Sequence, residues 1–190
     1  SSVSHLGFCT LGIFALTPHG LAGSIIQQIN HGISTGGLFL LIGVLYERRH
    51  TRDLDAFGGL WKVMPVLGSL ALIVTLSSMG LPGLNGFVGE FTILLGAFGS
   101  TALASPWIAG VAALGVILAA VYLLHMFQKV FLGPVTHSEN AALKDLSARE
   151  IAMLVPLLGL IFWIGLYPKP FLDRIEPTTR VLLDRLVVEL

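Results

Sequence analysis

Charged residues are gathered into short stretches that separate long apolar runs. Residues 1–46 contain no Asp, Glu, Lys or Arg, and between Val63 and Gln128 the only charged residue is Glu90. Residues 151–168 are again free of charge. Because a bilayer core about 30 Å thick needs about 20 apolar residues per crossing helix, these runs are long enough to span a membrane.

The apolar runs divide into five predicted membrane segments. No alternating strand pattern of the barrel type is present, so helices are the expected way to satisfy the backbone inside lipid. The segments are 2–17, 20–46, 63–98, 106–128 and 151–168. We therefore expect an all-α fold, a polytopic transmembrane helical bundle over residues 1–168.

The segment 63–98 is too long for one straight crossing. It would form a helix of about 54 Å, and helix-breaking residues gather in its middle, near 80–86. The breakers are Gly80, Pro82, Gly83 and Gly86. Two arrangements fit this pattern: two short spans joined by a tight turn, or one span interrupted halfway.

The distribution of basic residues favours the interrupted span. If the segment crosses once, the loops 47–62 and 129–150 lie on one side of the membrane, and the loops 17–19 and 99–105, without Lys or Arg, lie on the other. The basic side then holds Arg48, Arg49, Arg52, Lys62, Lys129, Lys144 and Arg149. Two crossings would remove this bias. The positive-inside rule therefore predicts one discontinuous helix, with the basic loops in the cytoplasm.

Two shorter signals concern the end of the chain. The Ser-x-x-Glu spacing of Ser147 and Glu150 predicts a capping box where the last span begins. The tail 169–190 alternates apolar and charged residues and is too charged to span. We expect it to form an amphipathic, interfacial helix that lies along the membrane surface or against a partner.

Composition excludes several kinds of function. The chain of 190 residues is 54% hydrophobic and 12% charged, whereas soluble domains carry about 25% charged residues. Its 11 basic and 11 acidic residues leave no positive excess for nucleic acid. Cys9 is the only cysteine, no histidine pair has the spacing of a metal site, and no nucleotide-binding glycine fingerprint is present. We expect no metal, no cofactor and no nucleic acid on this chain.

Glu90 is the main candidate for chemistry. It lies about one turn into the second half of the interrupted segment. A charge inside a membrane span is costly and usually marks an ion or proton pathway. The alternative is a carboxylate at a helix end that reaches the membrane interface. No Lys or Arg lies at comparable depth, so we expect a cationic partner to come from outside these residues.

His31 and His5 are weaker candidates. His31 shares a polar helix face with Gln27 and Ser34. It either hydrogen bonds to neighbouring helices as part of the packing or relays protons. His5 lies on the first segment and is a second candidate for such a relay.

Several stretches carry a family resemblance. They are residues 1–8, 31–39, 45–61 and, most specifically, 81–91. Together they resemble the antiporter-like subunits of respiratory complex I, the NADH:quinone oxidoreductase, of the chain M (subunit 4) type. Relatives among the multisubunit cation/proton antiporters carry Lys where this sequence has Glu90.

The resemblance implies a C-terminal portion of a proton pump built from inverted helical repeats. The chain would be most of the second repeat plus the final helix, truncated at its N-terminus, in a bacterial cell membrane. Glu90 would exchange protons, and His5 and His31 would lie on the polar axis leading to it. NADH, FMN, iron–sulfur clusters and quinone would bind other subunits. The expected partners are other membrane subunits and lipid, with no small-molecule substrate other than protons.

Three functions remain open at this point. The first is proton translocation in an NADH:quinone oxidoreductase, with no redox site on this chain. The second is a subunit of a cation/proton antiporter. The third is a non-transporting membrane scaffold, for which the exchange Glu90→Gln would be silent.

Overall fold

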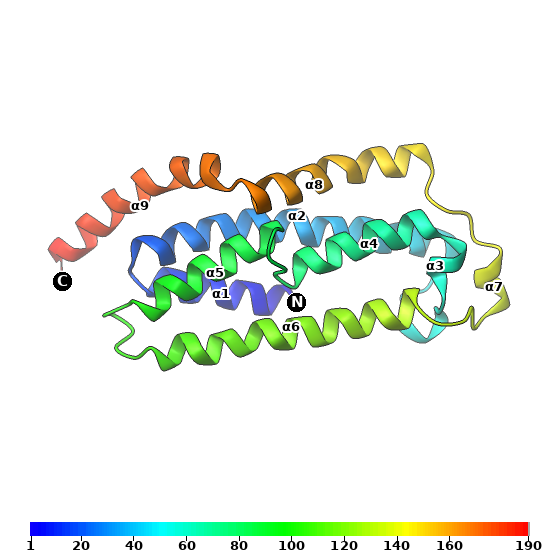
Figure 1. Ribbon diagram of the computed structural model, residues 1–190, viewed down its shortest axis with the longest axis horizontal. Helices are drawn as coiled ribbons and strands as arrows, with labels where there is room; N and C mark the ends of the chain where they lie inside the picture. The colour runs from blue at the N-terminus through cyan, green and yellow to red at the C-terminus, as the bar shows by residue number, and fades with distance from the viewer. Residues whose placement is uncertain (190) are drawn as a thin grey trace.

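The computed structural model describes residues 1–189, which form a bundle of helices along one long axis (Figure 1). The main helices are α1 (Ser2–Phe14), α2 (Pro18–Arg49), α4 (Pro65–Ser78), α5 (Asn85–Phe98), α6 (Trp107–Phe131), α8 (Ala148–Leu166) and α9 (Lys169–Glu189). Three short helices, η1 (Leu54–Ala56), α3 (Leu60–Val63) and α7 (Ser138–Ala141), lie in the connections. No strand occurs among the described residues, and the predicted all-α class is confirmed.

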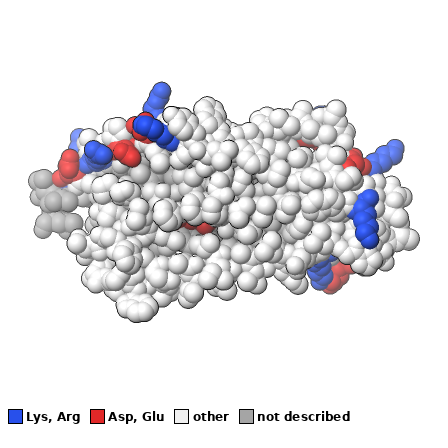
Figure 2. Space-filling view, viewed as in Figure 1, with Lys and Arg blue, Asp and Glu red and all other residues white. Residues whose placement is uncertain are grey.

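Three of the apolar helices have the length that a membrane crossing requires. The helices α2, α6 and α8 are long and apolar enough to cross, and α1, α4 and α5 are shorter apolar helices. Charged side chains gather toward the two ends of the face shown in Figure 2, and only small acidic areas are visible on the broad surface between them. This largely uncharged belt matches the hydrocarbon core of a bilayer.

The helices α4 and α5 follow one another in the same direction beside α2 (Figure 1). The chain leaves helical structure between Ser78 and Asn85 and resumes it along the same path. Both basic connections, which contain α3 and α7, lie at the same end of the bundle. The segment is therefore one interrupted crossing, as the distribution of basic residues predicts.

Glycines allow α2 and α5 to approach each other closely. A Cβ atom added at Gly96 of α5 would lie 2.6 Å from the Cα atom of Gly20 in α2, and one at Gly23 would lie 2.7 Å from the backbone nitrogen of Ile93. A Cβ at Gly89 would overlap the side chain of Gln27. Small residues of this kind bring the backbones of membrane helices together. This packing fixes α5 against the middle of α2.

The segment before α8 holds the basic end of the bundle together. The carboxylate of Asp145 accepts hydrogen bonds from the backbone N–H groups of Val66 (2.8 Å) and Leu67 (3.0 Å). These N–H groups belong to the first turn of α4 and have no partner within the helix. Asp145 therefore caps the first half of the interrupted crossing.

Arg48 at the end of α2 joins the same region to α8. Its guanidinium donates to both carboxylate oxygens of Glu150, at 2.7 and 2.9 Å. Glu150 and Ser147 form the capping box that the sequence predicts. The side chain of Glu150 is 12% exposed, so the pair is largely shielded from water. The helices α2, α4 and α8 are thereby tied together at this end.

We expect Arg48→Met to destabilise the folded protein by about 2 kcal/mol, because Glu150 loses a partner while staying largely buried. The matched control is Arg49→Met, whose partner Glu139 has a side chain that is 68% exposed; its expected cost is about 0.5 kcal/mol. Thermal unfolding of the full-length protein in lipid nanodiscs measures both. Equal effects of the two exchanges would contradict this role of Arg48.

Candidate functional site

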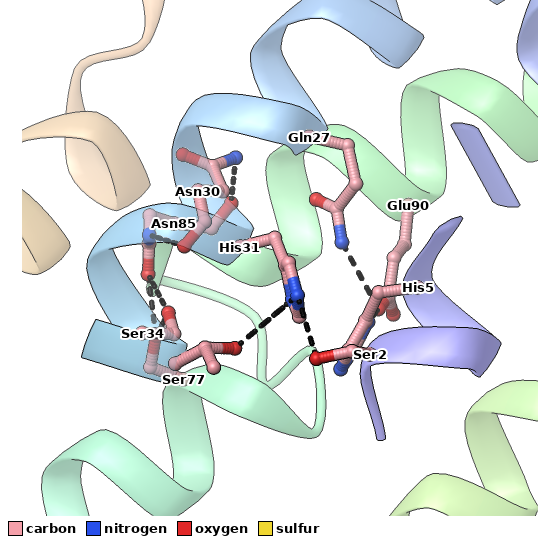
Figure 3. A network of polar contacts seen from close by, with 10 residues as sticks. Ser2, His5, Gln27, Asn30, His31, Ser34, Ser77, Asn85 and Glu90 are labelled. Atoms are coloured by element: carbon pink, nitrogen blue, oxygen red, sulfur yellow. Dashed lines mark hydrogen bonds and ion pairs between the residues drawn. The ribbon is translucent and has the colours of Figure 1, made fainter. Parts of the chain in front are cut away.

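Glu90 lies buried where three helices meet. Glu90 belongs to α5 and is 3% exposed. Its Oε1 atom lies 2.9 Å from Nδ1 of His5 on α1. Gln27 on α2 donates from Nε2 to the same oxygen at 3.3 Å (Figure 3). His5 itself is 4% exposed. The expectation of a partner from outside these residues is therefore wrong: an imidazole of this chain faces the carboxylate, and one proton can bridge them.

The second carboxylate oxygen of Glu90 faces the interruption of the helix. A Cβ atom added at Gly80 would lie 2.6 Å from Oε2 of Glu90. Gly80 also has a φ of +76°, a conformation that residues with a Cβ rarely adopt. Gly80 is thus required both for the turn and for the space that the carboxylate occupies.

The other predicted helix breakers shape the turn without touching Glu90. Pro82 lies in its exposed part. Gly83 has a φ of +92°, and its carbonyl oxygen packs where a Cβ of Gly165 in α8 would stand. Gly86 packs in the same way against the carbonyl oxygen of Ser77. Gly86 thus joins the two halves of the crossing, Gly83 packs against α8, and only Gly80 adjoins the carboxylate.

His31 lies next to His5 and not next to Glu90. The centres of the two imidazole rings are 5.1 Å apart. The ring nitrogens of His31 lie 3.1 Å from Oγ of Ser2 and 3.0 Å from Oγ1 of Thr35. The three predicted residues therefore form a row, with His5 between His31 and Glu90. Over the described part of the chain, no three His, Cys, Asp or Glu side chains converge as metal ligands would.

A second polar cluster closes the interruption itself. The Asn30 side chain on α2 donates from Nδ2 to the backbone oxygen of Asn85 at 2.7 Å, and Asn85 returns a bond to the backbone oxygen of Asn30 at 3.3 Å. The Ser77 hydroxyl donates to Oδ1 of Asn85 and lies 2.7 Å from Oγ of Ser34. These bonds tie the end of α4 and the start of α5 to α2.

A small cavity lies between the row of ionisable residues and this cluster. Its volume accessible to the centre of a water molecule is about 10 Å³, which is close to the room that one buried water needs. It is lined by His5, Gln27, Asn30, His31, Ser34, Ser77, Ser78 and Gly86. The buried atoms Oε1 of Gln27, Oδ1 of Asn30 and Oγ of Ser78 have no hydrogen-bond partner among the described residues. The cavity has the size and the polar groups to hold one water against the imidazoles.

The sequence indicated some of these positions more clearly than others. Gln27, Ser77 and Asn85 were not predicted as site residues. Gln27 lies on the polar face that includes His31, and Ser77 and Asn85 are polar side chains beside the helix breakers. Polar residues next to an interruption in an apolar run are the signal that could have identified them.

Comparison with known proteins gives consistent matches. The family model described as "NADH:quinone oxidoreductase/Mrp antiporter, TM" matches residues 1–119. NADH-quinone oxidoreductase subunit M of Rickettsia typhi is 43% identical over 183 residues, which cover 96% of this chain and 36% of that protein. The same subunit of Rhodobacter capsulatus is 40% identical over 184 residues, covering 97% and 35%.

A solved structure matches over nearly the same extent. One chain in the structure of respiratory complex I from Thermus thermophilus with bound NADH superposes with a TM-score of 0.87 at 38% sequence identity. The match covers 95% of this chain and 37% of that chain. The present chain thus spans little more than a third of the length of the proteins that it matches.

Proposed function

Because this chain belongs to the NADH:quinone oxidoreductase/Mrp antiporter transmembrane family, we propose that the full-length protein is a proton-translocating membrane subunit of an NADH:quinone oxidoreductase, of the chain M type. The observation that carries the proposal is the buried Glu90 carboxylate, 2.9 Å from the buried imidazole of His5 at the interruption of a membrane helix. The complex would lie in a bacterial cell membrane, with other membrane subunits and lipid as partners. NADH, FMN, iron–sulfur clusters and quinone would bind its other subunits.

In this proposal Glu90 exchanges protons with His5. A proton moves from Nδ1 of the imidazolium to Oε1 of the carboxylate, which leaves a neutral imidazole and a neutral carboxylic acid. Gln27 holds Oε1 in place by donating to it. The next proton reaches His5 from the His31 imidazole or from a water held in the polar cavity, since both adjoin the ring of His5.

The test uses the full-length protein in its purified complex, reconstituted into sealed vesicles. We expect redox subunits to co-purify and the addition of NADH and quinone to drive protons across the membrane. Proton flux that follows a Na⁺ gradient without NADH would instead assign the protein to the cation/proton antiporters. The absence of both fluxes in an assembled complex would favour a scaffold.

The contact between Gly80 and Glu90 gives a prediction for transport. Gly80→Ala places a methyl group against Oε2, and we expect NADH-driven proton pumping to fall about tenfold or more, because small displacements of a reacting group are costly. Gly83→Ala is the matched control: it imposes a similar backbone strain of about 1–2 kcal/mol, but its Cβ would lie 3.9 Å from the nearest atom. Equal losses of pumping in the two variants would show that backbone strain alone is responsible.

A further inference from the structure

A separate apolar pocket lies at the basic end of the bundle. It has a volume of about 380 Å³ and is lined by α2, α4, α6 and the segment that precedes α3. Leu38, Ala71 and Met126 are among its lining residues from the three long helices. The volume lies within the range of about 300–1,000 Å³ that is typical of ligand sites. None of these three residues takes part in the site around Glu90.

The wall of this pocket is apolar along most of its length. Its polar side chains are Tyr46, Thr51 and Arg52, which lie toward the basic end of the bundle, and Thr75 on α4. Filling this pocket with water is unfavourable, because water in contact with apolar surface costs free energy. The pocket therefore suits an apolar chain that carries a polar group at the end near Arg52.

Arg52 supplies a positive charge at this end of the pocket. Its guanidinium carbon lies 4.8 Å from the centre of the Tyr46 ring, and it makes no ion pair with the side chains that the structure describes, those of residues 1–186. Three other basic side chains at this end form ion pairs, as Arg48–Glu150, Arg49–Glu139 and Lys129–Asp55. Of the basic side chains at this end, Arg52 is the one that lines the pocket. The neighbouring carboxylate of Asp53 accepts a hydrogen bond from the backbone of Asp55. Arg52 is thus available to an anion from outside the chain.

We infer that this pocket binds an anionic phospholipid, with one acyl chain between α2, α4 and α6 and the phosphate beside Arg52. The charge of Arg52 is complementary to the phosphate, and basic pockets between membrane helices on the cytoplasmic side bind anionic head groups. Tyr46 stands beside Arg52, and tyrosine is enriched at membrane interfaces. The inference depends on the membrane location of the chain and not on proton transfer at Glu90.

Photo-crosslinking tests the inference in the purified complex that contains the full-length chain. The complex is placed in phosphatidylcholine nanodiscs that contain a little phosphatidylglycerol with a diazirine on one acyl chain. We expect labelled peptides to include Leu38 or Met126. Arg52→Gln should reduce this labelling about fivefold, the effect of one charge near an anionic lipid, and Arg52→Lys should retain most of it.

A second variant fills the pocket directly. Gly43 lines it, and a Cβ atom there would meet nothing within 4 Å, so Gly43→Leu should reduce labelling without disturbing the helices. Gly36→Leu is the matched control, because Gly36 has the same open space and does not line the pocket. Equal labelling by a diazirine phosphatidylcholine would overturn the inference. An absence of label in the pocket would also overturn it, and would mean that another part of the longer chain covers this surface.

Discussion

Glu90→Gln is expected to reduce proton transfer through this subunit by about two orders of magnitude or more, the usual contribution of a positioned acid or base. The amide has the same shape as the carboxyl group and keeps an oxygen that can accept from Gln27. The amide cannot take up or release a proton near neutral pH. Because Glu90 lies 2.9 Å from His5 and is only 3% exposed, the amide interrupts proton exchange with His5.

The measurement is vesicle acidification per NADH oxidised, with the assembled complex quantified on native gels. Glu47→Gln is the matched control, because it makes the same chemical exchange at an exposed carboxylate at the basic end of α2. We expect the control to pump normally and both variants to assemble. Normal pumping by Glu90→Gln would reduce Glu90 to a structural residue and would favour the scaffold hypothesis.

The interrupted crossing could be predicted from the sequence because its causes are local. Apolar runs, the breakers around Gly80 and the placement of Lys and Arg act over a few residues or along a single connection. Glu90 was found for the same reason, as the one charge between Val63 and Gln128. Each of these signals can be seen without knowing which helices are neighbours.

The partners of Glu90 could not be predicted in this way. His5 and Glu90 are 85 positions apart, and Gln27 and Glu90 are 63 positions apart. Their meeting depends on which faces of α1, α2 and α5 pack together, and the glycines of the interface determine that packing. In the sequence, a histidine on an apolar helix is compatible either with packing or with proton relay. The contact between the His5 ring and the Glu90 carboxylate is visible only in the structure.

The second large effect is expected at the glycine contacts between α2 and α5. We expect Gly96→Ala to destabilise the folded protein by about 3 kcal/mol or more, because the new methyl group meets backbone atoms of Gly20 that cannot rotate away. The helices α2 and α5 must then separate, which also pulls Gln27 and Glu90 apart, so that stability and pumping fall together. Thermal unfolding in nanodiscs and the amount of assembled complex measure the first effect.

Gly110→Ala is the matched control for Gly96→Ala, because it adds the same methyl group to the helix α6. There a Cβ would lie 3.9 Å from the nearest atom, in Trp107. Alanine is favoured over glycine within a helix by about 1 kcal/mol, so this control should be neutral or slightly stabilising. If Gly96→Ala were as stable as Gly110→Ala, the close approach of α2 and α5 would not be required by the fold. The position of Glu90 beside α2 would then need another physical cause.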